Sequence, residues 1–165
     1  MAYKLTSPNA GLGSQPLDAN SAVQMHSLGL IASGEDPVYG TGEFIYLKGL
    51  ASVAVGTWVT YNLDDGTVTL LAANAIGPVA IAMSPSVANE FGWYQISGKA
   101  VGKCLTGYAD NGLVFATATA GSVDDAVVAG DRVKLALGAS AIGTPAAGLA
   151  EFEITRPFMD DATAA

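Results

Sequence analysis

Charged side chains are scarce in this sequence of 165 residues, because Asp, Glu, Lys and Arg together make up only 13% of it. Cations are the scarcer sign: seven Lys and Arg stand against fifteen Asp and Glu, which gives a net charge of −8. Proteins that bind DNA or RNA neutralise phosphates with clustered Lys and Arg, and the sequence has no such cluster. We therefore expect no nucleic acid among its partners.

Cysteine and histidine each occur once. Cys104 has no second cysteine with which to form a disulfide or a cysteine-based zinc site within the chain, so it is predicted to be a small buried residue on a strand. His26 is the only candidate base for a Ser-His-Asp arrangement. It lies in a stretch rich in Gly, Ser and Pro, where a preorganised catalytic site is not expected.

Sequence motifs that carry chemistry are missing as well, since neither GxSxG nor HExxH occurs. Residues 92–100 have one residue too many between their glycines for a phosphate loop, and an alanine where Ser or Thr would bind magnesium. The acidic pairs Asp64–Asp65, Asp124–Asp125 and Asp160–Asp161 lack further oxygen ligands at the spacing of a calcium loop. We expect no enzymatic activity, no cofactor and no metal site.

Apolar residues are abundant: they make up 50% of the chain, and the mean hydropathy is +0.38. The longest uncharged run, residues 66–89, could span a bilayer by length, but Pro78 and Pro85 interrupt it. We interpret this run as strands and turns. Residues 1–9 lack the apolar segment of a signal peptide, so the protein is expected to be made and used without secretion and without a membrane partner.

Short β-branched and aromatic runs separated by Gly, Pro and Asn predict an all-β fold, either a small β-barrel or a β-sandwich. The clearest hairpin is residues 57–71, with Asp65 and Gly66 in a tight turn at positive φ. Two later strands alternate charged and apolar residues, so one face of each is predicted to be buried. The predicted strands are 43–48, 57–62, 67–71, 77–83, 92–98, 99–105, 113–117, 131–135 and 150–155.

These strands predict a compact domain over residues 43–157, with an extended N-terminal arm over residues 1–42 and a flexible acidic tail over residues 158–165. The arm has isolated apolar residues with no sustained period, although residues 22–30 alternate enough to predict one strand. Residues 123–129 follow Ser122, a good N-cap, and are predicted to form one or two helical turns.

Five stretches of the sequence together form a recognisable order of elements: a hairpin, then a Gly-rich return strand, then a strand of the form Trp-x-Gln-x-x-Gly. They are residues 42–49, 55–61, 75–83, 92–100 and 129–133. On these stretches, residues 43–157 resemble the decoration, or cement, proteins of tailed-bacteriophage capsids. The resemblance implies a structural virion protein on the outer capsid surface, made in the host cytoplasm, that bridges neighbouring major capsid subunits. No catalytic residue comes with it.

The partners that the resemblance implies are the major capsid protein and further copies of the chain, as a homo-oligomer in which a trimer is favoured over a dimer. Apolar residues of the arm and of the first strand are candidates for the contacts with these partners. They are Leu17, Val23, Met25, Leu28, Leu30, Ile31, Tyr39, Phe44 and Tyr46.

Two other functions fit the sequence less well. A head fibre or a host-receptor or glycan-binding virion module would stack sugars on exposed aromatic rings. The candidate rings are Tyr46, Trp58, Tyr61, Trp93 and Tyr94. A small hydrolase or ligand-binding barrel is disfavoured by the single histidine and the missing motifs.

Overall fold

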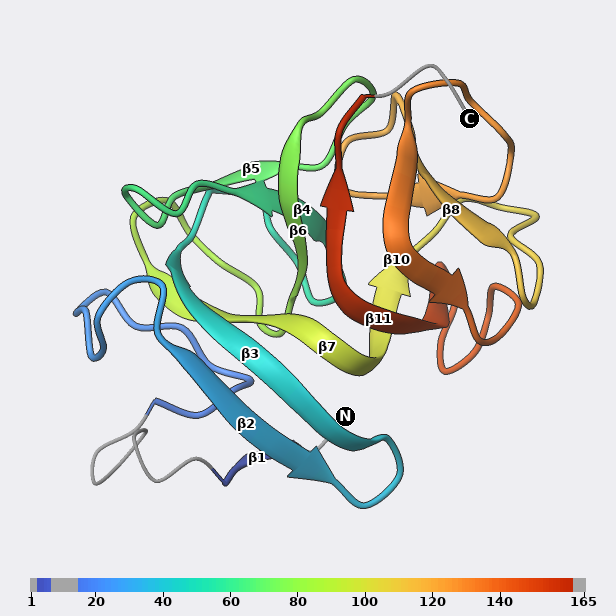
Figure 1. The fold of residues 1–165 in the computed structure, drawn as a ribbon. Coiled ribbons are helices and arrows are strands. Elements are labelled where there is room, and N and C mark those ends of the chain that lie inside the picture. The colour runs from blue at the N-terminus through green and yellow to red at the C-terminus, as the bar shows by residue number, and fades with distance from the viewer. Residues whose placement is uncertain (1–2, 7–14, 162–165) are drawn as a thin grey trace.

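The computed structural model describes residues 3–6 and 15–161, and this part of the chain is all-β with no helix. Eleven strands form one antiparallel sheet (Figure 1), which confirms the predicted all-β class. The strands are β1 (Lys4–Leu5), β2 (Ile31–Asp36), β3 (Gly40–Lys48), β4 (Trp58–Tyr61), β5 (Val68–Leu70), β6 (Gly77–Ala82), β7 (Phe91–Lys103), β8 (Leu113–Ala116), β9 (Val123–Asp124), β10 (Arg132–Gly138) and β11 (Leu149–Met159).

The sheet is strongly curled, because β6, β7 and β11 each pair with the other two. Its main path runs β1-β2-β3-β7-β6-β11-β10-β8-β9, and β4 joins β5 to β6. The long strand β7 changes partners at Gly98, which has a φ of +97°. A Cβ at Gly98 would lie 2.4 Å from the Thr41 carbonyl oxygen, so only glycine fits this corner.

Strand β3 is buried on both faces, as its continuous apolar run suggests. Ile45 and Leu47 point into one hydrophobic cluster with residues of β4, β6 and β7. Phe44 and Tyr46 point into another cluster on the opposite face. Each large side chain buried in this way contributes about 1.5–3 kcal/mol to folding.

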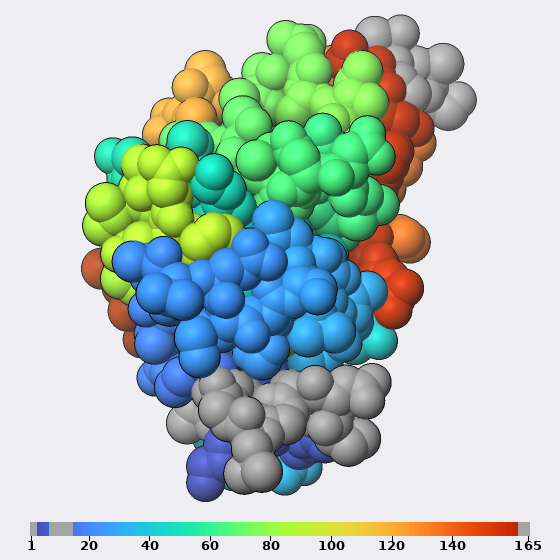
Figure 2. Space-filling view, turned by 90° about the vertical axis from the view of Figure 1, so that its left-hand side faces the viewer, coloured from blue at the N-terminus to red at the C-terminus, as the bar shows by residue number. Residues whose placement is uncertain are grey.

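The described part of residues 1–42 covers the second of these faces, so a separate extended arm is not confirmed. Strand β2 pairs with β3 along its whole length, and Leu17 is buried at 3% exposure among the side chains of that face. Figure 2 shows this segment, in blue, packed directly against the green and yellow-green middle of the chain. Part of the supposed arm, residues 7–14, lies outside the described residues.

Two predicted elements are wrong. Residues 22–30 form no strand; Ser21 makes an isolated bridge with Phe91, and Gly29 donates its N–H to the Tyr46 carbonyl at 2.8 Å. Residues 123–129 form no helix, because Val123 and Asp124 pair with β8 as strand β9. Tertiary pairing overrides a weak local preference in both segments.

The hairpin over residues 57–71 is confirmed, but its turn is wider than predicted. The last pair of the β4–β5 ladder is Tyr61 with Val68, and Gly66 rather than Asp65 has a positive φ, of 68°. Residues 92–98 and 99–105 were predicted as two strands, whereas β7 runs from 91 to 103 as one.

Candidate functional site

His26 is held by packing. Its ring lies 5.0 Å from the ring of Tyr46 and 5.3 Å from that of Trp93, measured between centroids. Its Nε2 accepts the backbone N–H of Gln15 at 3.4 Å. The histidine therefore helps to fasten the N-terminal segment to β3 and β7.

Cys104 is buried at 6% exposure, as predicted, directly after β7. Burial, followed by the nearby carboxylates Asp124 and Asp125, raises the pKa of its thiol to about 11. The thiol therefore stays protonated near neutral pH, and only a thiolate is an effective nucleophile or metal ligand.

Members of the acidic pairs make structural contacts within the fold. The Asp65 carboxylate accepts hydrogen bonds from the N–H and the hydroxyl of Thr67, which lower the pKa of Asp65. Asp125 accepts the N–H of Ala109 at 2.9 Å. Among the described residues, no three His, Cys, Asp or Glu side chains are grouped closely enough to hold a metal ion.

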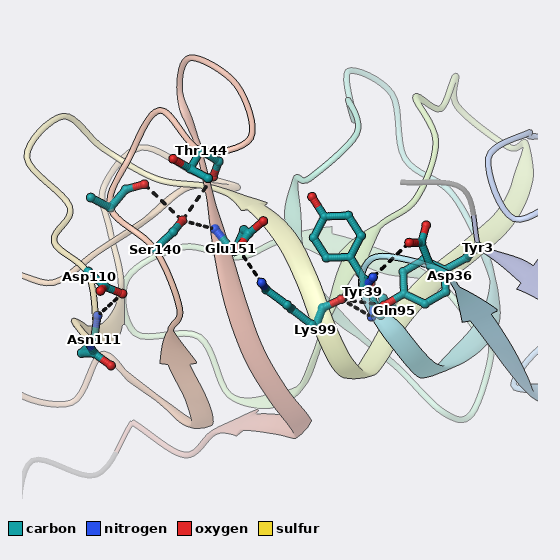
Figure 3. A network of polar contacts seen from close by, with 11 residues as sticks. Tyr3, Asp36, Tyr39, Gln95, Lys99, Asp110, Asn111, Ser140, Thr144 and Glu151 are labelled. Atoms are coloured by element: carbon teal, nitrogen blue, oxygen red, sulfur yellow. Dashed lines mark hydrogen bonds and ion pairs between the residues drawn. The ribbon is translucent and has the colours of Figure 1, made fainter.

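A buried glutamine braces the corner of β7 (Figure 3). Gln95 is fully buried, and its Nε2 donates to the carbonyl oxygens of Ser97 and Lys99, each at 3.1 Å. The Tyr3 hydroxyl donates to the same Lys99 carbonyl at 2.7 Å. The Trp-x-Gln-x-x-Gly pattern thus has a structural basis, since its glutamine supports the corner that its last glycine, Gly98, makes possible.

An ion pair lies beside this corner. Lys99 Nζ is 2.7 Å from Glu151 Oε2 and 5.5 Å from the centroid of the Tyr39 ring (Figure 3). The hydrogen bond with Glu151 raises the pKa of Lys99, and burial raises the pKa of Tyr39, so both keep their protons near neutral pH. A partly exposed pair of this kind contributes under about 1 kcal/mol, and it acts as a structural contact.

Most of the predicted partner contacts lie inside the protein. Leu17, Phe44 and Tyr46 are buried, and Leu28, Leu30 and Tyr39 pack partly buried against the same cluster. The remaining three, Val23, Met25 and Ile31, are exposed by 67%, 49% and 40%. The structure therefore brings six of the nine residues together as core and leaves only these three facing solvent.

The proposed sugar platform is also mostly buried. Trp58, Trp93 and Tyr46 have no exposed surface, and Tyr94 is only 2% exposed. Tyr61 alone of the five rings is partly exposed, and it lines a shallow groove of about 490 Å³ with Asn62, Leu63 and Ile76.

An exposed apolar surface lies where the sequence did not indicate one. The alternation in residues 131–135 predicted Leu135 on the buried side with Val133. A β-bulge intervenes, Leu135 has a φ of +60°, and its side chain is 63% exposed. A left-handed conformation costs a non-glycine residue roughly 1–2 kcal/mol. No Gly or Asn marks the bulge, so nothing in the sequence signalled it.

This surface, called the outer face below, spans the outward side of β8, β10 and β11, the adjoining start of β6, and the β4–β5 turn, whose Leu63 lines one groove with Ile76 and Pro78. Phe158 pairs directly with both Lys134 and Pro78, and directly opposed residues share one side of a sheet. The exposed apolar residues of the outer face are Leu63, Ile76, Leu113, Leu135, Leu137 and Phe158.

The described residues define the protein class as all-β, built on one curled antiparallel sheet. No protein-family model, no curated protein and no solved structure matches the chain. Among residues 3–6 and 15–161 there is also no helix of the length and apolarity needed to cross a membrane.

Proposed function

We propose that this chain is a structural, non-enzymatic virion protein that decorates the outer surface of a tailed-phage capsid and cements neighbouring major capsid subunits. The resemblance of residues 43–157 to decoration proteins supports this proposal. One structural observation carries it: an apolar outer face with a strained residue, Leu135, is offered to solvent, while His26 and Cys104 are used in packing and Asp65 and Asp125 accept hydrogen bonds within the fold. Extended apolar contact suits a protein that holds subunits together.

A small barrel is the architecture we propose for its central part. β7, β11, β10, β8 and β9 pair in that order, and an isolated bridge joins Val123 of β9 to Cys104 at the end of β7. Such a circuit of pairings is what barrel closure requires.

The proposed contact with the major capsid protein uses the three predicted contact residues that are exposed, Val23, Met25 and Ile31. Deleting residues 1–35 would be a poor test, because it removes most of β2 and uncovers the buried Phe44 and Tyr46. Point substitutions at the exposed residues keep the core intact.

Reconstitution on capsids tests the proposed function. Purified protein is mixed with expanded phage heads that lack it, and bound protein is measured after sedimentation. We expect saturable binding, and at least a tenfold weaker affinity for the double variant Val23→Asp, Met25→Asp. A Val127→Asp variant, changed at a loop residue that is 79% exposed, is the control and should bind normally. Failure of the unaltered protein to bind heads would contradict the proposal.

The second candidate is a head-fibre or glycan-binding module, and the groove beside Tyr61 is the observation that favours it. A sugar stacked on Tyr61 would be weakened by Tyr61→Ala, measured on an array of host glycans. Saturable glycan binding that this substitution abolishes would replace the cement proposal with this one.

A further inference from the structure

The outer face has a size that suits a protein partner. It combines six apolar residues that are exposed by 37% to 69%, and a group of exposed apolar residues on one face of a protein often marks an interaction site. A standard interface buries roughly 800 Å² on each partner, so a polar rim around these side chains completes the area. A peptide or small molecule would leave much of the patch exposed.

Several charges of the outer face have partners of opposite sign on it or on a neighbouring strand. Lys134 pairs with Asp160, and Arg156 Nε lies 3.2 Å from Glu43 Oε2 of β3. Glu153, which is opposite Leu137 in the ladder, is also opposite Lys99 of β7. The chain as a whole carries −8, so two copies repel each other over most of their surfaces. An apolar face with partnered charges is where two such copies meet with the least electrostatic cost.

The outer face also has the form of a self-complementary contact. Leu135 protrudes on the β10 side of Phe158, and the groove lined by Leu63, Ile76 and Pro78 lies on the β6 side. Figures 1 and 2 show β6 and the green segment before it directly beside the red strand β11. A two-fold axis near Phe158, which would form a dimer and not the trimer that the resemblance favours, would place each Leu135 over the groove of the other copy.

We propose that the outer face is the contact between copies of this chain, and that Leu135 of one copy seats in the Leu63–Ile76 groove of the next. The inference deepens the proposed function by assigning the homo-oligomer a surface, yet it concerns the isolated protein and needs no capsid. The bulge at Leu135 then has a use, since it turns outward a side chain that strand alternation would bury.

The test measures the mass of the purified full chain in solution by light scattering and sedimentation over a range of concentrations. We expect an oligomer whose proportion rises with protein concentration. For Leu135→Asn we expect a dissociation constant at least tenfold higher than that of the unaltered protein. Asn accepts the left-handed conformation, so the variant should remain folded, which its melting temperature checks. Val127→Asn, which removes a 79% exposed apolar residue outside the outer face, is the matched control and should associate normally.

Mixing variants tests the seating of Leu135 in the groove. Ile76→Asn alters the groove and should also reduce association, and Ile76 is 69% exposed, so folding is spared. A mixture of the Leu135→Asn and Ile76→Asn proteins retains one intact contact and should associate more strongly than either variant alone.

Three results would overturn the inference: an unaltered protein that stays monomeric, an oligomer that Leu135→Asn leaves intact, or a mixture that associates no better than its components. A monomer that still binds phage heads would refute this contact while leaving the cement function in place. An oligomer that responds to the substitutions as expected but does not bind phage heads would support this contact and refute the cement function.

Discussion

Leu135 on β10 and Arg156 on β11 lie on paired strands and share a left-handed backbone, with φ of +60° and +49°. The two irregularities fall in the same interval of the ladder, where the register shifts between Lys134 and Ala136. Both side chains turn outward as a result. Arg156 gains a carboxylate partner in Glu43, whereas Leu135 places a large apolar side chain in solvent.

Replacing Leu135 by Gly should stabilise the isolated domain. Glycine adopts φ of +60° without steric cost, and we expect the free energy of unfolding to rise by about 0.5–1 kcal/mol in chemical denaturation at concentrations where the protein is monomeric. Leu137→Gly in the same strand, where φ is ordinary, should instead destabilise by about 1 kcal/mol. Equal losses in both variants would show that the bulge stores no strain.

The corner of β7 should tolerate no side chain at Gly98. Gly98→Ala combines a left-handed φ with a Cβ placed 2.4 Å from the Thr41 carbonyl oxygen, and we expect a loss of about 3 kcal/mol or more in the free energy of unfolding. Gly143 has a similar φ of +102° with nothing near its Cβ position, so Gly143→Ala should cost only about 1 kcal/mol. The difference between the two, measured by urea unfolding, isolates the close approach of β3 to β7.

Close approach also explains why β2 could not be predicted. Its sequence, Ile-Ala-Ser-Gly-Glu-Asp, is poor in strand-forming residues. A Cβ at Gly34 would lie 2.9 Å from the Phe44 ring and 3.0 Å from the Lys4 carbonyl oxygen, so packing demands a small residue there. Gly34 lets β2 pack closely against Phe44, but a glycine also weakens the strand pattern in the sequence of β2.

The N-terminal segment should prove to be docked, and Tyr46→Phe tests this. The Tyr46 hydroxyl donates to Gln15 Oε1 at 2.8 Å and accepts the N–H of Met25 at 3.1 Å. Removal of this hydroxyl in Tyr46→Phe leaves its polar partners unpaired, which should lower the free energy of unfolding by about 1–3 kcal/mol. Hydrogen exchange at the Met25 backbone amide should also be faster in this variant than in the unaltered protein.

Tyr61→Phe is the control for that experiment, because the Tyr61 ring is partly exposed beside an open groove. It should change stability by less than about 0.5 kcal/mol. Unchanged exchange at Met25 in Tyr46→Phe would mean that residues 15–30 do not rest on β3 in solution.

Stability should decline at alkaline pH in part through Cys104. Its thiol pKa is raised from 9.0 to about 11 by folding, so the unfolded chain releases this proton first. The stabilisation is complete below pH 9 and is lost as pH rises toward 11. Cys104→Ala should show a shallower fall in the free energy of unfolding over this interval, and identical slopes would contradict the buried thiol.

The strands with strong β-branched and aromatic runs, such as β3 and β4, could be predicted because their local preference agrees with their burial. The outer face could not, because a bulge reverses the side of the sheet on which Leu135 lies without any residue that announces it. Likewise, the sequence around Leu17 and Tyr46 is equally compatible with a partner contact and with a core position. Only the course of the chain over β3 assigns both residues to the core.

The copy number of the chain in purified virions tests the central claim most directly, by quantitative mass spectrometry against the major capsid protein. A cement protein that bridges capsid subunits across the whole shell predicts hundreds of copies per particle, in a fixed ratio to capsid protein. A few dozen copies or fewer, or none, would contradict the account.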